Sequence, residues 1–409
     1  MAGEPLKIIH TADFHLGITA RNIIGHEVEE KRRQDLRRNV SRIFDEAIRR
    51  NVDLVLICGD VFHRSDPSNR DFVFFAKEVG KVLAKGIKVV IIAGNHDKPR
   101  TIGAQNPLQA LVEIGTPNFY YIQSLPKEPL IIDIKNDKKV GIIPIPYIDP
   151  RLVREISGST MGYEAFVRNK IREVIGNSEE LMNVDYRILM AHLTLTGAIV
   201  KKIWSIYITE PKVSISTLNE KFFDYIALGH VHTFQKFSSK VVYPGSIERI
   251  DFSEIDEDKG FIYAEIFEDS IRIERIPLEC RRMMSSSKIS IVNSRDPVRL
   301  ILESFKLMDM PPGSIIRLEI EADAESWREF ERKRRIIEDY LFGEKKILGY
   351  AIKRHLIKMM TSKVEVYPQE KISLRKSILE YINKLRIDEE IKKRALELAE
   401  KIMDEEGIA

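Results

Sequence analysis

The chain has 409 residues, of which 44% are hydrophobic and 31% charged, and 65 basic residues against 62 acidic ones leave a formal net charge of +3. This composition is typical of a globular protein and excludes a disordered or fibrous one. At about 150 residues per domain, the length predicts two or three domains. So small a net charge gives no general attraction to nucleic acid, and such a site would have to come from a local basic patch.

Nothing in the sequence indicates secretion or insertion into a membrane. The two cysteines, Cys58 and Cys280, form no disulfide framework. The first residues lack the pattern of a signal peptide, and no apolar run approaches the ~18 residues of a membrane span. We therefore expect an intracellular, cytoplasmic protein that makes no contact with a membrane.

Short apolar segments alternate with amphipathic ones over the first two thirds of the chain. Strands are predicted at residues 7–13, 54–58, 88–93, 140–148, 187–192, 224–229, 240–246 and 260–277. Helices with one apolar stripe are predicted at residues 27–51, 71–85 and 161–175. Apolar strands separated by helices indicate an α/β fold whose parallel strands are buried on both faces.

Polar residues that can bind metals follow five of these strands, where each apolar run stops. In chain order they are Asp13 and His15, Asp60 and His63, Asn95 and His96, His192, and His230 and His232. The carboxyl ends of parallel strands meet at one edge of a sheet, so we expect these side chains to lie together. In the Asp-x-His and His-x-His pairs, alternate residues share a face, and one ion can take both. A single pair also fits an ordinary strand-end acid beside a surface histidine, but chance is a poor explanation for five.

The other three histidines suggest different roles. His10 lies inside the first strand and is interpreted as a packed residue or as one that supports a ligand. His26 and His355 have no metal-binding residues near them in the sequence and are interpreted as surface residues.

The order of the strand-end motifs and their amino-acid sequences resemble those of a known family. The motifs are TADFHLG at 11–17, GDVFH at 59–63, GNHD at 94–97, the lone His192, and ALGHVH at 227–232. They resemble the calcineurin-like metallophosphoesterases, and more sharply the SbcD and Mre-eleven nucleases of DNA double-strand-break repair. The motifs cover residues 10–232, and beyond them only the order of the domains carries the resemblance.

The resemblance implies a pair of metal ions that share Asp60. One ion would be held by Asp13, His15, Asp60 and His232, and the other by Asp60, Asn95, His192 and His230. Mixed imidazole, carboxylate and amide ligands suit Mn²⁺, Fe or Zn without separating them. We expect two Mn²⁺ ions per chain. By the same resemblance, His96 would protonate the leaving 3′ oxygen or steady the phosphate, and His63 would contact the scissile phosphate.

The resemblance also implies the architecture: an α/β/β/α sandwich of two sheets over residues 1–277, a small α+β capping domain over 278–362, and a linker with a helical hairpin over 363–409. In the capping region, strands are predicted at 288–292 and 314–321 and helices at 297–305 and 325–341. Residues 328–363 hold eleven Lys or Arg against five Asp or Glu. This excess fits a solvated helix face or, as the resemblance implies, a surface that seats DNA.

Two surfaces are expected to bind other chains. Residues 372–406 form two amphipathic helices with apolar stripes, and 35 residues cannot bury both stripes alone. The hairpin must dock on its own protein or, as the resemblance implies, on the coiled-coil base of a Rad-fifty or SbcC ATPase. In the helix at 71–85, Val73 and Phe74 lie outside the apolar stripe. They indicate either a wide core or a homodimer surface shared with the helix at 107–114, and we favour the dimer.

The function implied is that of a two-metal DNA nuclease, with 3′-to-5′ exonuclease and single-strand endonuclease action, in complex with the ATPase. Its partners would be DNA ends and single strands. Two alternatives stay open. One is a related phosphoesterase that acts on nucleotides or phosphoproteins, and the other is a scaffold that tethers DNA ends without catalysis.

Overall fold

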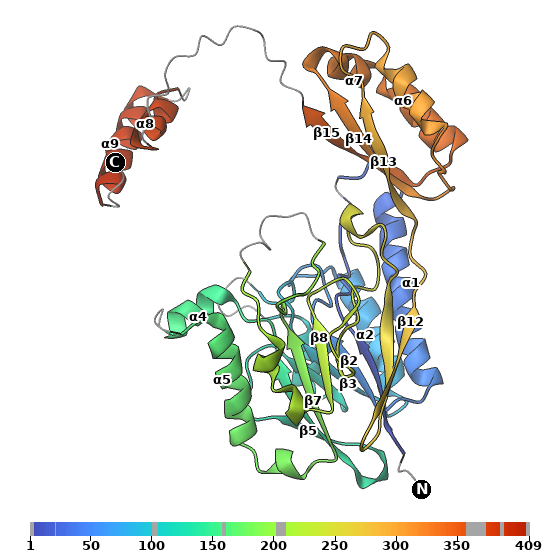
Figure 1. The fold of residues 1–409 in the computed structure, drawn as a ribbon, viewed down its shortest axis with the longest axis vertical. Helices are drawn as coiled ribbons and strands as arrows, with labels where there is room; N and C mark the ends of the chain where they lie inside the picture. Colours follow the sequence, from blue (N-terminus) through green and yellow to red (C-terminus); the bar gives the residue numbers. More distant parts are fainter. Residues whose placement is uncertain are drawn as a thin grey trace. The chain divides into compact units, whose positions relative to one another are not determined.

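The computed structural model describes residues 4–20, 22–99, 105–157, 161–201, 210–356, 374–384 and 388–405. The chain falls into two compact units, Met1–Ile357 and Lys358–Ala409. Figure 1 shows the elements of each unit. The predicted linker around residues 367–370 lies outside the described residues.

Two six-stranded sheets form the body of the first unit. The first sheet has the order β12-β11-β1-β2-β3-β4 and the second the order β5-β6-β7-β8-β10-β9. The strands of the first are β1 (Leu6–Thr11), β2 (Leu54–Cys58), β3 (Lys88–Ile92), β4 (Phe119–Ile122), β11 (Gly260–Ile266) and β12 (Ile271–Pro277). Those of the second are β5 (Leu130–Asp133), β6 (Lys139–Ile145), β7 (Tyr186–His192), β8 (Tyr225–Gly229), β9 (Gln235–Lys236) and β10 (Val241–Tyr243).

The inner strands of the second sheet are parallel between two antiparallel edge strands, and the first sheet has four parallel strands with two antiparallel strands on one side. In the first sheet β1 to β4 run parallel, while β11 and β12 are antiparallel. In the second, β6, β7, β8 and β10 run parallel between the antiparallel β5 and β9. The segment predicted at 260–277 is therefore two strands joined by a hairpin rather than one continuous strand.

Helices cover the outer face of each sheet. On the first sheet they are α1 (Val28–Arg49), α2 (Asn69–Leu83) and α3 (Leu108–Glu113), and on the second α4 (Pro150–Ser157) and α5 (Tyr163–Gly176). Short 3-10 turns lie at Lys135–Asp137, Glu180–Asn183, Ile215–Leu218, Glu220–Phe222 and Phe252–Glu254. The predicted α/β/β/α sandwich is confirmed, with α1 and α2 on one side of the two sheets and α5 on the other (Figure 1).

The alternation of side chains along each strand builds the layers. Val55 and Ile57 of β2 face α1 and α2, whereas Leu54, Leu56 and Cys58 face the second sheet, and all five are buried. This is why the inner strands read as continuous apolar runs.

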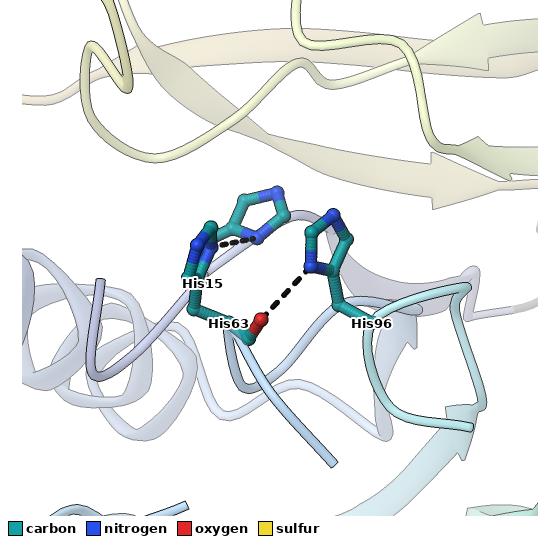
Figure 2. Close-up of side chains that lie close together, drawn as sticks. All are labelled: His15, His63 and His96. Carbon is teal, nitrogen blue, oxygen red and sulfur yellow. Dashed lines mark hydrogen bonds between the residues drawn. The ribbon is translucent and has the colours of Figure 1, made fainter. Parts of the chain in front are cut away.

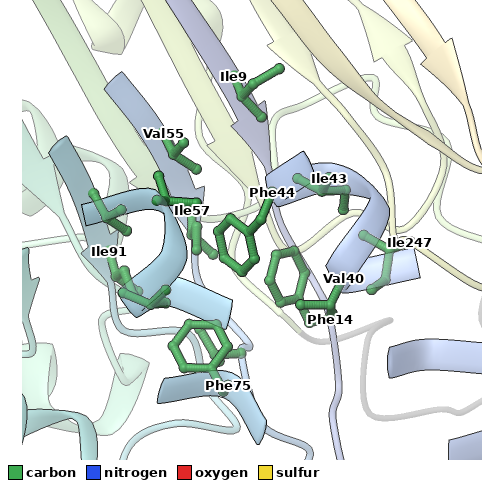
Figure 3. Close-up of a cluster of buried hydrophobic side chains, with 14 of the residues drawn as sticks. Ile9, Phe14, Val40, Ile43, Phe44, Val55, Ile57, Phe75, Ile91 and Ile247 are labelled. Carbon is green, nitrogen blue, oxygen red and sulfur yellow. The ribbon is translucent and has the colours of Figure 1, made fainter. Parts of the chain in front are cut away.

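Phenylalanines of the ligand loops anchor those loops in the core beneath α1 and α2. Phe14, between Asp13 and His15, is fully buried and meets the ring of Phe44 edge to face, with centroids 6.5 Å apart (Figure 3). Phe62, in the loop after β2, packs in the same way on Phe75 at 5.7 Å. The core therefore fixes the backbone from which the polar side chains project.

A third sheet of three parallel strands follows. It consists of β13 (Met283–Ser290), β14 (Ile315–Ala322) and β15 (Gly349–Leu356), and it packs on α6 (Pro297–Phe305) and α7 (Ala324–Glu338), which continues as a π-helical turn over Asp339–Glu344. Asp323 caps α7 by accepting hydrogen bonds from the backbone amides of Glu325 and Ser326. This small domain has its own apolar core, while the boundary at residue 277 remains a prediction.

The described residues of the second unit form two helices, α8 (Leu374–Lys384) and α9 (Glu389–Glu405). They agree with the predicted hairpin, and an ion pair of 2.6 Å joins Arg375 to Asp404. Among the described helices of both units, none combines the length and the apolar character that a bilayer-spanning segment needs.

Candidate metal centre

The residues predicted from five strand ends converge at the carboxyl edge of the two sheets. His192 is the last residue of β7, and the other candidates lie in the loops after β1, β2, β3 and β8. Six of the seven expected metal ligands are buried: Asp13, His15, Asp60 and His192 are at most 2% exposed, and His230 and His232 are each 6% exposed. Only Asn95, beside the surface, is less deeply buried.

The backbone of these loops is held in a conformation that side chains rarely adopt. Asp13, His15, Asp60 and His230 have positive φ angles of 55°, 47°, 55° and 91°. Such residues cost free energy, and they persist where surrounding contacts hold them. Here the amide of Asp13 donates to the carbonyl of Gly59 at 3.0 Å, and that of His15 to the carbonyl of Asp60 at 2.9 Å. The loops after β1 and β2 thus support each other.

Two glycines let the loops approach closely. A Cβ atom on Gly94 would lie 2.0 Å from Oδ1 of Asp60, and one on Gly59 would lie 2.2 Å from Nδ1 of His192. No side chain fits at such distances, so the glycines that precede the polar residues are required by the packing of the site.

One group of candidate ligands contains Asp13, His15 and His232. Their ligand atoms lie within 4.8 Å of one another. The Nε2 atoms of His15 and His232 are 3.0 Å apart. Nδ1 of His232 donates to the carboxylate of Glu254 at 2.8 Å, which leaves Nε2 of His232 with a lone pair that points at His15.

A second group contains Asn95, His192 and His230. Oδ1 of Asn95 lies 3.2 Å from Nε2 of His192 and 3.1 Å from Nδ1 of His230, and these two nitrogens are 3.2 Å apart. Nδ1 of His192 donates to the carbonyl of Cys58 at 2.7 Å, so a neutral His192 carries its lone pair on Nε2. The amide oxygen and the two ring nitrogens therefore form a nearly equilateral triangle of electron-pair donors.

Asp60 lies between the two groups. Its Oδ2 atom is 3.7 Å from Nε2 of His15 and 3.7 Å from Nε2 of His192, while Oδ1 accepts the backbone amide of His96 at 2.8 Å. Burial alone would raise the pKa of Asp60, but at the low pH where this carboxyl titrates, protonated His192 and His96 hold its pKa below the usual value. The carboxylate is thus ionised and equidistant from both groups.

The protonation states suit metal binding. Burial lowers the pKa of His192 to about 4, so its imidazole is neutral near pH 7. A neutral imidazole, an ionised carboxylate and an amide oxygen are donors for Mn²⁺, Fe or Zn. These donors converge, and each aims a lone pair inward. The arrangement fits a pair of divalent cations, but it does not show which metal is bound.

The rings of His15, His63 and His96 form a further cluster at the mouth of the site (Figure 2). His96 Nδ1 donates to the carbonyl oxygen of His63 at 2.9 Å, and the two rings stack with centroids 5.0 Å apart. Nδ1 of His63 lies 3.4 Å from Nδ1 of His15. Both His63 and His96 are more exposed than the aspartates and histidines among the candidate ligands, as groups that meet a substrate would be.

Three carboxylates that support the site were not predicted. Glu254 holds His232, and Glu210 accepts from Nε2 of His230 at 2.9 Å. Asp97 accepts backbone amides from Gly94, Val61 and Phe62 at 3.0 to 3.3 Å and so ties the loops after β2 and β3 together. Burial, and then the charge of Asp60, raise the pKa of Asp97 to about 7. Glu254 and Glu210 stand outside every strand-end motif, so the sequence carries no signal for them.

The three histidines that were not predicted to bind metal or substrate lie mostly where we expected them. His10 is fully buried between the sheets, where it bonds to the Tyr225 hydroxyl and the Leu228 carbonyl, and His26 is exposed. His355 differs from the expectation in part, because it is half-buried and pairs with Glu319 at 2.9 Å across β14 and β15.

An α/β sandwich whose strand ends carry buried histidines and aspartates in this arrangement defines a metal-dependent phosphoesterase. The chain belongs to the calcineurin-like phosphoesterases, because the model of that family matches residues 6–234. The resemblance of the strand-end motifs to this family is thereby confirmed.

Distant relatives of the chain are archaeal proteins named DNA double-strand break repair protein Mre11. That of Sulfurisphaera tokodaii is 25% identical over 73% of this chain and 69% of its own length. That of Methanopyrus kandleri is 23% identical over 62% and 51%, and that of Thermoplasma acidophilum is 24% identical over 77% of each.

Solved structures with a similar fold include TT1561 of Thermus thermophilus and a dimetal phosphatase from Danio rerio. They are 12% and 11% identical, and the match covers 67% and 68% of this chain and 100% and 99% of theirs. Both TM-scores are 0.37, too low to add to the fold described above.

Proposed function

We propose that the protein is a two-metal-dependent DNA nuclease with 3′-to-5′ exonuclease and single-strand endonuclease action. The observation that carries the proposal is the position of Asp60, whose Oδ2 atom lies 3.7 Å from a histidine of each ligand group. Asp60, with Asp13, His15 and His232, would hold one ion. With Asn95, His192 and His230 it would hold the other. The names of the archaeal relatives support DNA as the substrate.

When bound, a pair of divalent cations stabilises the attacking and leaving oxygens of an in-line phosphoryl displacement. The chain holds the ligands in position, and its buried environment strengthens the electrostatic interactions that they make. We expect Mn²⁺ in both positions, with Fe or Zn as alternatives of the same ligand preference.

His96 and His63 act on the substrate in this proposal. Nδ1 of His96 is engaged with the His63 carbonyl, so Nε2 is the atom that can give a proton to the leaving 3′ oxygen. His63 stacks on His96 and contacts the scissile phosphate. The two stacked rings would hold each other in place while the substrate is bound.

Surfaces beyond the metal centre support a substrate larger than a nucleotide. The small domain over residues 278–362 places Lys353 and His355 on the strand β15 of its sheet, and Arg317 on the neighbouring β14. Glu319 pairs with all three of these residues, so part of the local basic excess is neutralised within the domain. On α7, Arg332, Lys333 and Arg334 also pair with glutamates of the same helix. The exposed Arg328 and Arg335 are the residues of this helix that would contact phosphates of DNA.

The hairpin over residues 372–406 would bind the coiled-coil base of a Rad-fifty or SbcC type ATPase. On α9, the apolar side chains of Ile391 and Leu398 are each 59% exposed and lie seven residues apart, on one side of the helix. Exposed apolar side chains at this spacing are typical of a helix that docks on another helix.

The proposal is tested by cleavage assays on the purified full chain. With Mn²⁺ the protein should degrade 3′-ended duplex DNA and nick single-stranded circles, and chelation should abolish both activities. His96→Asn should retain bound metal and lose about 10²- to 10⁴-fold in the cleavage rate. His26→Asn, at an exposed histidine outside the motifs, is the matched control and should cleave like the wild type.

Two results would overturn the proposal. Turnover of a chromogenic phosphomonoester without cleavage of DNA would favour a phosphoesterase that acts on nucleotides or phosphoproteins. Binding of DNA ends without any metal-dependent turnover would favour a scaffold that tethers DNA.

A further inference from the structure

A cavity of about 670 Å³ opens beside the second ligand group. Asn95 and His230 line its inner end, and the loop after β6 together with α4 and the start of α5 form its walls. We call it the tyrosine cavity, after the two tyrosines among its lining residues Tyr147, Arg151, Val153, Arg154, Met161 and Tyr163. Its volume lies within the range of about 300–1,000 Å³ in which proteins bind small organic groups.

The aromatic part of the lining continues from the metal centre. The ring of Tyr147 lies 5.9 Å from that of His230, tilted by 38°, and meets the ring of His192 edge to face at 6.2 Å. Tyr163, the first residue of α5, packs against the core under the second sheet, so its ring has a fixed position. Burial raises the pKa of the Tyr163 phenol, which is therefore neutral near pH 7.

Charged groups lie at the outer rim. Arg151 forms hydrogen bonds of 2.7 to 3.2 Å with Asp149, which fix the start of α4. Arg154, one turn further along α4, is exposed at the rim of the cavity. Glu210 is the other acidic residue of the lining, and its carboxylate is bonded to Nε2 of His230. The α4 side of the cavity thus offers arginine, whereas the inner end offers rings, aliphatic groups and the Glu210 carboxylate beside His230.

We infer that the tyrosine cavity receives one unstacked nucleotide of the substrate strand, with its base against the tyrosines. Aromatic side chains bind bases by stacking irrespective of sequence, and an arginine beside them can meet a backbone phosphate. Because Asn95 and His230 are at once cavity lining and candidate metal ligands, a base in the cavity would belong to the nucleotide next to the scissile phosphate. The inference rests on the proposed nuclease function and specifies how that function selects nucleic acid.

The cavity distinguishes nucleic acid from other phosphate esters. A phosphoserine or a sugar phosphate has no flat ring to lie against Tyr147 or Tyr163, and would leave these surfaces in contact with water. The base should therefore add affinity that the phosphate alone does not provide.

The experiment compares two small probes on the full chain by isothermal titration calorimetry with Mn²⁺ present. The probes are 2′-deoxyguanosine 5′-monophosphate and 2-deoxyribose 5-phosphate, which lacks the base. The nucleotide should bind at least about tenfold more tightly. Tyr163→Leu should remove most of this preference, whereas Tyr120→Leu, at a half-buried tyrosine of β4 outside the cavity, should retain it.

A second pair of variants uses residues on the protein surface, where folding is not at risk. Arg154→Ala should weaken binding of both probes, because both carry the phosphate, and should leave their ratio unchanged. Arg172→Ala, at an exposed arginine of α5, is the control and should bind both probes as the wild type does.

The outcomes separate this inference from the proposed function. Equal affinity of the wild type for the two probes would overturn the inference, even if the protein cleaves DNA. A preference for the nucleotide that disappears in Tyr163→Leu would support it, even if no DNA is cleaved. In that last case the nuclease proposal would fail while the cavity stands as a nucleotide site.

Discussion

Glu254 governs the geometry of one half of the metal centre although it offers no atom to the centre itself. Its carboxylate holds Nδ1 of His232 and also accepts from Lys259 at 2.7 Å. Burial alone would raise the pKa of Glu254, but His232 and Lys259 hold it well below its usual value. An ionised partner on Nδ1 fixes the ring and makes Nε2 a better electron donor.

Replacement of Glu254 should therefore weaken one metal position and spare the other. Glu254→Gln removes the charge behind His232, and affinity at one of two Mn²⁺ sites should fall by about 10- to 100-fold in calorimetric titrations. Glu257→Gln is the matched control, because Glu257 bonds to the same lysine at 2.7 Å and has no bond to His232. Equal effects of the two changes would assign Glu254 a purely structural role.

His10 provides a pH dependence of stability that is independent of the metal ligands. Burial lowers its pKa to about 3, against 6.5 for an unperturbed histidine. As the pH falls from about 6.5 towards 3, the unfolded chain takes up a proton at His10 that the folded chain does not, so the folded state loses stability. Asp97, whose raised pKa is about 7, acts in the opposite direction, and a variant is needed to isolate His10.

The comparison is between the metal-free wild type and His10→Gln, which cannot titrate. Between pH 7 and pH 5, Tm should fall by roughly 4 °C more in the wild type than in the variant, measured by circular dichroism. Parallel decreases in the two proteins would show that His10 is protonated in the folded state at the same pH as in the unfolded one.

The candidate ligands were predictable at the scale of single residues, and the carboxylates behind them were not. Asp13, Asp60 and His230 can be recognised in the sequence because a buried apolar run ends next to each of them. Glu254 lies in a 3-10 turn 22 residues after its partner His232, and Glu210 precedes its partner His230 by 20. Contacts of that kind depend on how loops fold back, which a local pattern does not encode.

At the scale of elements, the buried strands were predicted, and three short strands at sheet edges were not. β2 and β3 are apolar on both faces because helices and a second sheet cover them. β4, β5 and β9 have only two to four residues and lie near sheet edges, where the apolar pattern is short. β15 was missed for another reason: Lys353, Arg354 and His355 made it resemble a charged surface segment, whereas it pairs in parallel with β14.

The hairpin of α8 and α9 is the element whose exposed residues point to a partner. Removal of residues 370–409 should abolish co-purification with the coiled-coil ATPase while metal binding persists. The double change Ile391→Glu and Leu398→Glu should have the same effect, because it places charges on the exposed apolar side of α9. Lys393→Glu, an exposed charge reversal on the same helix, should leave co-purification intact. Survival of the complex after the deletion would place the docking site elsewhere.

At the scale of the whole molecule, the helices α2 and α3 are expected to pair two copies of the chain. Val73 on α2 is 63% exposed, and Ile114, directly after α3, is 75% exposed. Phe74 is only half-buried and packs partly on the core, with the guanidinium of Arg37 over its ring at 5.5 Å. Phe74 therefore fits the wide-core interpretation, and Val73 is the residue that we expect in a contact surface.

Val73→Glu should halve the mass in light scattering after gel filtration, because a charge would enter the interface. Leu307→Glu is the control, since Leu307 is 91% exposed in the small domain, far along the chain from α2. A monomeric wild type, or a dimer that survives Val73→Glu, would contradict the proposed pairing.

The two sheets of the sandwich bring their strand ends to one edge, and Asp60 is the residue at which the two ligand groups meet. The proposed two-metal mechanism depends on that carboxylate serving two ions. The most direct test is an anomalous difference map from crystals grown with Mn²⁺. We predict two peaks flanking Asp60, about 3.5–4 Å apart, one beside His15 and His232 and the other beside His192 and His230. A single peak, or two peaks that do not share Asp60, would contradict it.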